Sequence, residues 1–154
     1  MVEEEKPRKV VVDTHALLAM AFGELGEKAT QLLQDVRRGR VVGLLPVTVA
    51  YEYIVHWRRG RIPVLTSLEE VVTFLTRYFR VENLDLTDWV KAAEIKHRGD
   101  GLLRDAEDPD LKRRRLSIVD STVIVLAQKH RAPIVTGDRD LAYVASKLGI
   151  TVAW

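Results

Sequence analysis

The chain has 154 residues, 47% of them hydrophobic and 30% charged, and its 24 basic and 22 acidic side chains leave a net charge of +2. This length corresponds to one ordinary domain, and the composition excludes a disordered or low-complexity protein. The absence of cysteine excludes disulfides, thiolate metal sites and cysteine nucleophiles.

The N-terminal segment predicts neither a signal peptide nor a membrane span. Residues 1–9 carry charges of both signs, and the apolar stretch after them is interrupted by Asp13 and His15. We therefore expect one domain over residues 1–154, with residues 1–8 as an N-terminal extension, in a cytoplasmic protein that does not contact a membrane.

The hydrophobic pattern predicts strands that alternate with helices. Ser67 and Glu70 have capping-box spacing at the start of one helix, and Thr87 is the expected N-cap of a later one. In chain order, we expect a strand at 10–12 followed by a helix, a helix at 24–37, a strand at 41–45, helices at 48–60 and 67–78, a strand at 79–84, helices at 87–97 and 118–127, a strand at 133–135, a helix at 139–148 and a strand at 150–152.

Residues 99–115 depart from this pattern. Several acidic residues and Pro109 precede the basic run 112–115, and no apolar period continues through the segment. We expect a charged, exposed loop here.

The alternation of strands and helices predicts the fold class. Helices of this length between strands imply right-handed crossovers and a parallel sheet with helices on both faces, which is a three-layer α/β/α fold. Ligands of such folds bind beyond the carboxyl ends of the strands, where the following helices begin. Functional side chains are therefore expected at this edge.

Five acidic residues fall at that predicted edge. Asp13 closes the first strand, Asp138 and Asp140 follow the fourth, Asp120 lies in the first turn of the 118–127 helix, and Glu52 lies about one turn into the helix after the second strand. These segments are distant in sequence, so their convergence is a tertiary prediction.

Each acid also has a structural explanation. Asp13 and Asp138 precede helices and are typical N-caps. Asp120 has capping-box spacing from Ser117, and Glu52 can pair with the histidine four residues on. Caps, however, have no reason to collect in one place, so the shared edge favours a functional interpretation.

Clustered carboxylates require a cation. Two of them about 5 Å apart repel by roughly 3 kcal/mol at an effective dielectric constant near 20. Oxygen ligands without cysteine select Mg²⁺ or Mn²⁺ over zinc. Such a site can activate water for phosphodiester hydrolysis.

The basic residues are also clustered, and arginines outnumber lysines by sixteen to eight. Guanidinium groups suit phosphate contacts, although a solvated, ion-paired surface explains such clusters equally well. The clusters are Arg37, Arg38 and Arg40; Arg58, Arg59 and Arg61; and Lys112, Arg113, Arg114 and Arg115. We expect Arg113, Arg114, Arg115 and Arg139 to contact substrate phosphates. Thr136 is expected to bind substrate, a carboxylate or a metal-bound water, with backbone hydrogen bonding as the alternative.

Four stretches together carry a family resemblance. They are 10–18 (VVVDTHALL), 46–52 (PVTVAYE), 116–121 (LSIVDS) and 134–141 (IVTGDRDL). In this order, and over about residues 8–154, the chain resembles the PIN-domain nucleases and, among them, the VapC-type toxins of toxin-antitoxin pairs.

The resemblance implies a parallel sheet in the order 3-2-1-4-5, Mg²⁺ or Mn²⁺ dependence, endoribonuclease activity, a homodimer and an antitoxin partner. It implies that Asp13, Asp120 and Asp138 bind metal, that Glu52 binds metal or orients the attacking water, and that Asp140 assists through water. Residues 99–115 are longer and more charged than the usual connection in these toxins.

Three alternatives remain open. The chain could be a PIN-domain RNA-processing nuclease outside toxin-antitoxin systems, or a PIN-like module that binds RNA or protein without cleavage. A phosphatase of the haloacid dehalogenase type also places aspartate after the first strand, but it expects a second aspartate where this chain has His15.

Overall fold

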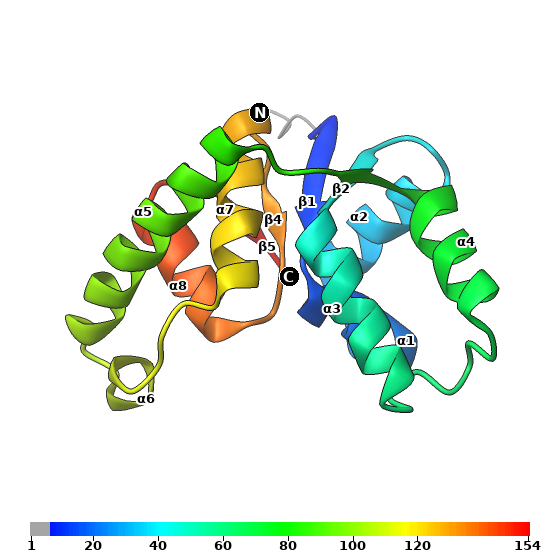
Figure 1. Ribbon diagram of the computed structural model, residues 1–154, viewed down its shortest axis with the longest axis horizontal. Helices are drawn as coiled ribbons and strands as arrows, with labels where there is room; N and C mark the ends of the chain where they lie inside the picture. Colours follow the sequence, from blue (N-terminus) through cyan, green and yellow to red (C-terminus); the bar gives the residue numbers. More distant parts are fainter. Residues whose placement is uncertain (1–6) are drawn as a thin grey trace.

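The computed structural model describes residues 7–154, so most of the expected N-terminal extension lies outside the described residues. Five strands form a parallel sheet in the order β3-β2-β1-β4-β5 (Figure 1). They are β1 (Lys9–Val12), β2 (Val42–Pro46), β3 (Phe79–Glu82), β4 (Ile134–Val135) and β5 (Val152–Ala153). The predicted α/β class and strand order are confirmed.

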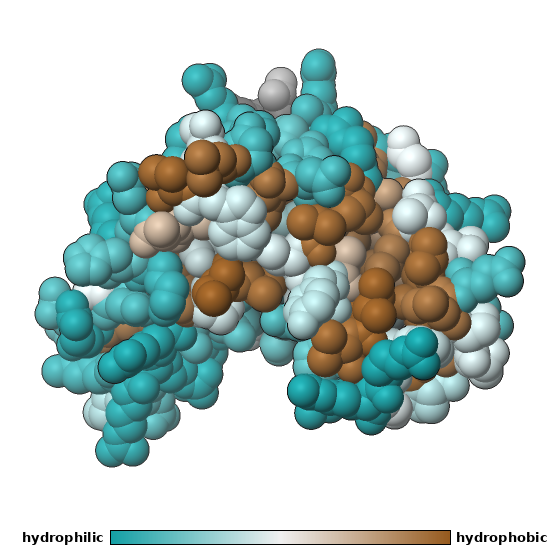
Figure 2. Space-filling model, in the orientation of Figure 1, coloured by the Kyte–Doolittle hydropathy of each residue, from teal (hydrophilic) through white to brown (hydrophobic). Residues whose placement is uncertain are grey.

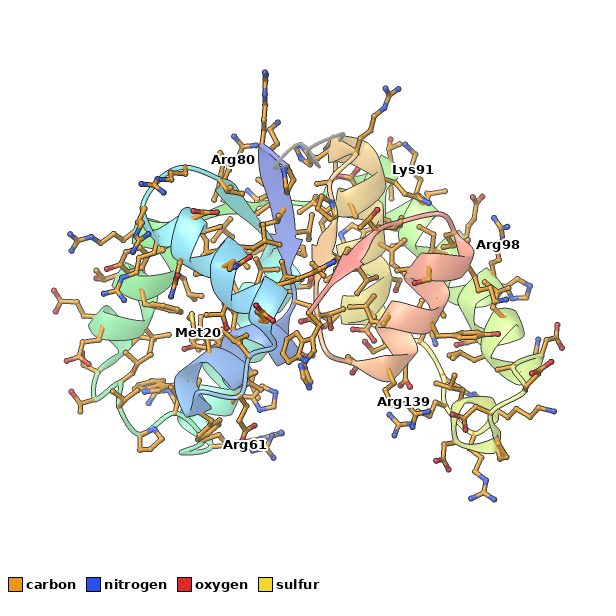
Figure 3. The ribbon with its side chains drawn as sticks, turned by 180° about the vertical axis from the view of Figure 1, so that it is seen from behind. Met20, Arg61, Arg80, Lys91, Arg98 and Arg139 are labelled. Carbon is orange, nitrogen blue, oxygen red and sulfur yellow. The ribbon has the colours of Figure 1, made fainter. Side chains whose placement is uncertain are left out.

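Helices cover the sheet on both sides. Figure 1 shows α3 and α7 in front of it, and the reverse view in Figure 3 shows α2 and α8 in front. The helices are α1 (Thr14–Phe22), α2 (Glu27–Arg37), α3 (Val47–Arg58), α4 (Leu68–Tyr78), α5 (Leu86–Arg104), α6 (Pro109–Lys112), α7 (Ile118–His130) and α8 (Arg139–Lys147). Within residues 7–154, no helix has the length and apolar character needed to cross a bilayer.

The centre of the fold is apolar because its elements are covered on all sides. Val10, Val11 and Val12 of the central strand are fully buried, as expected for a parallel strand between two helical layers. Residues 121–127 of α7 are all buried as well. The site described below is therefore built on the most rigid part of the molecule.

Residues 99–115 do not form the exposed loop that the sequence predicts. Helix α5 continues to Arg104, and the short helix α6 follows. Leu103, Leu111 and Leu116 are buried, so the segment packs on the domain. Gly99 lies inside α5 and does not end it. Glycine is needed there because a Cβ would come within 2.8 Å of the Leu116 side chain.

Several predicted boundaries are also corrected. Asp85, not Thr87, caps α5: its carboxylate accepts from the backbone N–H of Asp88 at 2.8 Å, and the Asp88 carboxylate accepts from the N–H of Asp85 at 3.1 Å. Helix α2 begins after Gly26, three residues later than expected. The strands β3 and β5 are each shorter than predicted.

Candidate active site

Asp13 and Asp138 are the N-caps of α1 and α8, and they lie at the carboxyl ends of β1 and β4, respectively. One oxygen of Asp13 accepts from the N–H of Ala16 at 2.9 Å. One oxygen of Asp138 accepts from the N–H groups of Asp140 at 2.9 Å and Leu141 at 3.1 Å. The structural and functional interpretations of these residues are thus compatible, because a cap at this edge holds its carboxylate in the site.

Thr136 connects the two caps. Its hydroxyl donates to the second oxygen of Asp13 at 2.7 Å and accepts from the N–H of Asp138 at 3.0 Å. The side chain is buried, at 1% exposure. This geometry does not support the expected contact between Thr136 and substrate; it makes Thr136 a residue that positions Asp13.

Asp120 and Glu52 reach the site from α7 and α3. The hydroxyl of Ser117 accepts from the N–H of Asp120 at 3.0 Å and so caps α7. The hydroxyls of Thr48 and Thr122 are 2.6 Å apart, and because Thr122 donates to a carbonyl of its own helix, Thr48 is the donor to Thr122. This bond joins the two helices that carry Glu52 and Asp120.

Sequence reasoning missed the pair of threonines. The two threonines are 74 positions apart, and a hydrogen bond between residues so distant leaves no pattern in the sequence. It also missed Thr14, whose buried hydroxyl beside Asp13 has no hydrogen-bond partner within the described residues.

The pKa values of Asp13 and Asp120 show that the acids affect one another. Burial raises the pKa of Asp13 to about 7 against its hydrogen bonds from Ala16 and Thr136, and the charges of Asp138 and Glu52 raise it further. Burial likewise raises the pKa of Asp120 to about 8, and the charges of Asp138, Asp13 and Glu52 add to it while Ser117 opposes it. Asp13, Glu52, Asp120 and Asp138 are therefore close enough for their charges to act on one another.

The charges of the acids act on one another, but their side chains do not form a ready-made metal site. Among residues 7–154, no three acidic or histidine side chains are gathered as a ready metal-ligand set. The capping bonds contribute to this, since they hold Asp13 and Asp138 on their own helices. Mg²⁺ is typically bound through only one or two carboxylates together with several waters. The carboxylates of the site, of which Asp13 is buried, are oxygen donors, and donors of this kind fit such an ion.

Two of the arginines expected to bind phosphate are held by carboxylates. Arg139 pairs with Asp108 and lies 4.0 Å from a carboxylate oxygen of Asp110, both beside α6. Arg114 lies 3.3 Å from a carboxylate oxygen of Asp140. Burial and the charge of Asp138 raise the pKa of Asp140, and Arg114 opposes them. We call these contacts the α6 ion pairs; they attach the segment after α5 to the first turn of α8.

The site opens on the molecular surface. Figure 2 shows a notch in the outline of the molecule between α6 and the C-terminal end of α3. In the reverse view, Arg139 lies at the lower edge on one side of the centre and Arg61 on the other (Figure 3). An apolar cavity of about 420 Å³ lies elsewhere, among α1, α2 and α4, and none of the five acids lines it. An open acidic edge suits a polymeric substrate better than an enclosed small molecule.

The fold has known relatives. It is similar to that of VapC20 from Mycobacterium tuberculosis, a toxin that cleaves the sarcin-ricin loop, with a TM-score of 0.58 and 19% identity over 92% of this chain and 96% of that one. It is also similar to that of PAE2754 from Pyrobaculum aerophilum, with a TM-score of 0.54 and 15% identity over 94% of this chain and 83% of that one. A search of curated protein sequences found no match.

The sequence itself matches a family. The family model of the PIN domain covers residues 10–147, a stretch that contains all five acids of the site. The order of the strands and the coupling of the acids agree with this match. The chain therefore belongs to the PIN domain family.

Proposed function

We propose that this protein is a Mg²⁺- or Mn²⁺-dependent endoribonuclease. The observation that carries the proposal is the pair of carboxylates formed by the buried Asp13 and the half-buried Asp120, whose pKa values are raised to about 7 and about 8 beside the charges of Glu52 and Asp138. Charges in this arrangement oppose folding unless a cation neutralises them. PIN-domain proteins are nucleases, and metal-dependent hydrolysis is the chemistry that such an arrangement serves.

Each acid has a role in the proposal. Asp13, Asp120 and Asp138 hold the ion, Glu52 is a further ligand or orients the attacking water, and Asp140 acts through water. When bound, Mg²⁺ or Mn²⁺ supplies the positive charge that stabilises a phosphoryl group during in-line displacement. The chain itself fixes Asp13 and Asp138 through their capping bonds. It buries Asp13, while Glu52, Asp120 and Asp138 are half-buried.

RNA is the proposed substrate. The acidic edge is open, and exposed arginines, among them Arg113 and Arg115, lie in the segment that joins α6 to α7. VapC20, to which the fold is similar, is a toxin that cleaves the sarcin-ricin loop. A phosphate backbone that meets the arginines brings its phosphodiester bonds to the acids.

A digestion of defined RNA tests this proposal. We expect cleavage with Mn²⁺ or Mg²⁺, none in EDTA, and cleavage by Asp13→Asn or Asp120→Asn that is about 10³-fold slower with the metal and absent in EDTA. Cleavage that persists in EDTA rejects the metal mechanism, and RNA that is bound but never cut favours the non-catalytic module.

A role as the toxin of a toxin-antitoxin pair is part of the proposal. Its support is the VapC-like pattern of the four stretches and the shared fold with a toxin. We expect growth arrest on expression in a bacterial host, no arrest by Asp120→Asn, and relief by a small antitoxin that covers the acidic edge. A host that grows normally while making active nuclease indicates an RNA-processing role instead.

The proposed homodimer has its own support. Exposed apolar side chains are gathered over α3, α4 and α5 on the face seen in Figure 2. Tyr51, Leu86, Val90 and Ile118 are 70%, 80%, 52% and 61% exposed. Apolar surface of this kind marks interaction sites. Light scattering of the purified protein should report a dimer, and Val90→Lys should shift it toward the monomer.

A further inference from the structure

One arginine cluster remains outside the proposed site. Arg58, Arg59 and Arg61 lie at the C-terminal end of α3 and are all exposed. No carboxylate within residues 7–154 pairs with any of the three. Arg58 lies over the ring of Trp57 at 5.0 Å, and Arg61 donates to Nδ1 of His56 at 2.7 Å. We call these three residues the α3 arginines.

The other arginines near the acids are differently engaged. Arg139 and Arg114 are held by carboxylates in the α6 ion pairs. Among residues 7–154, Arg58 contacts an aromatic ring and Arg61 an imidazole, and neither partner neutralises the charge of its arginine. A solvated, ion-paired surface, the ordinary explanation for such a cluster, is therefore not what the structure has at this position.

The α3 arginines are close to the acid site. His56 lies one helical turn beyond Glu52, and the charges of Glu52, Arg59 and Arg61 all act on it. The end of α3 forms one side of the notch, and α6 forms the other (Figures 1 and 2). The acids thus lie between two groups of arginines that come from different parts of the chain.

We infer that the α3 arginines are a second contact surface for the phosphates of RNA, on the side of the acid site opposite α6. This inference rests on the proposed nuclease function and deepens it. Guanidinium groups that lack a carboxylate partner present their donors to phosphate oxygens. An RNA strand held on both sides of the acids passes through the site, which matches cleavage within a strand rather than from its end.

A matched pair of triple variants tests the inference. The first changes Arg58, Arg59 and Arg61 to alanine. The control changes Arg37, Arg38 and Arg40 to alanine and so removes the same charge. These residues lie just before β2, where the N–H of Val42 donates to the carbonyl of Arg8, the residue before β1, so the control is at the amino-terminal edge of the sheet. Binding of a labelled single-stranded RNA is measured by fluorescence anisotropy in EDTA at several salt concentrations, and KM and kcat are measured with Mn²⁺.

The α3 triple variant should bind RNA about tenfold more weakly, with KM raised to match and kcat nearly unchanged. Because each phosphate contact to a single strand contributes about 0.7 to the slope of log K against log salt, its slope should fall by up to about 2. The control should stay within about twofold of the wild type. Equal losses in the two variants, or an unchanged slope in the α3 variant, overturn the inference.

Two further measurements keep the outcome clear. Arg61→Gln, which removes one charge and keeps a donor for His56, should give a smaller loss in the same direction and serves if the triple variant unfolds. Binding in EDTA does not depend on cleavage. If the wild type binds RNA and the α3 variant binds it more weakly, while neither cuts, the catalytic proposal fails and the contact surface stands. If the wild type cuts RNA with Mn²⁺ but the α3 variant has the same affinity and KM, the contact surface fails and the catalytic proposal stands.

Discussion

The charged side chains at the two ends of α7 have opposite surroundings: acids at its start and oppositely charged partners at its end. At its start, the half-buried Asp120 lies near other acids, and its pKa is raised to about 8. At its end, Lys129 lies 3.5 Å from a carboxylate oxygen of Asp88, and His130 lies 2.9 Å from one of Glu82. Both ends belong to one rigid helix, so the difference is not a matter of local mobility.

The contrast separates stabilising charge from functional charge. Paired charges at the end of α7 join it to α5 and β3 and favour the folded state. Unbalanced carboxylates at its start disfavour the folded state, and a fold retains them only where they bind something positive. Variants at the two ends should therefore differ both in activity and in the direction of their pH dependence.

The largest difference is expected in catalysis. Asp13→Asn or Asp120→Asn should lower RNA cleavage by about 10³-fold, the effect of removing a group that stabilises transition-state charge. Glu82→Gln, at the far end of α7, should leave kcat and KM unchanged. Cleavage rates with Mn²⁺ measure the effect of each variant. A large loss of activity in Glu82→Gln would contradict the conclusion that only the charges at the start of α7 serve catalysis.

The pH dependence of stability should have opposite signs at the two ends. Asp13 and Asp120 have raised pKa values in the folded state, so the folded protein binds more protons than the unfolded chain between about pH 4 and pH 8. Their contribution to the free energy of unfolding therefore falls as pH rises through this window. At pH 8, Asp120→Asn should raise the Tm of the metal-free protein by about 5 °C or more. At pH 4 it should have little effect.

Glu82 provides the reverse case. Although its burial opposes ionisation, His130 and Arg80 lower its pKa below the ordinary 4.5. Its stabilising effect is present above that value and is lost as pH falls through the lowered pKa. Glu82→Gln should therefore lower Tm at pH 7 and not at pH 3.

Mn²⁺ should raise the Tm of the wild type and of Glu82→Gln alike, and that of Asp120→Asn much less.

A smaller effect is expected from Thr136. Thr136→Val removes the hydroxyl that holds Asp13, and losing such a support costs about 10- to 100-fold in activity or metal affinity. Thr136→Ser, which keeps the hydroxyl, should recover most of the loss. If valine and serine behave alike, the role of Thr136 is packing rather than the positioning of Asp13. A titration of activity against Mn²⁺ distinguishes the variants.

The smallest effect is expected at the α6 ion pairs. Asp108→Asn with Asp110→Asn leaves Arg139 without its partners, but exposed pairs contribute less than about 1 kcal/mol. Urea unfolding should change by no more than this amount, and RNA should bind slightly more tightly because two negative charges are removed beside its path. Weaker RNA binding by this variant would indicate that the carboxylates position Arg139 for its phosphate contact.

The α/β class and the positions of the acids could be predicted because they follow from local rules. A β-branched run with Asp13 at its end determines a strand and a cap together, and parallel strands bring their carboxyl ends to one edge. The segment 99–115 could not be predicted in the same way. Its helical continuation depends on Leu103 and Leu111 finding apolar partners, and on Gly99 fitting under Leu116.

The sequence by itself determined the alternation of strands and helices, the place of each acid relative to its own strand or helix, and the arginine clusters, because each is a property of neighbouring residues and their spacing. Only the tertiary structure decided that Thr136 holds Asp13, that Thr48 meets Thr122, and which arginines are neutralised. The physical reason is that hydrogen bonds and ion pairs depend on separations of a few ångströms. Such separations between distant segments are set by packing, which no local pattern encodes.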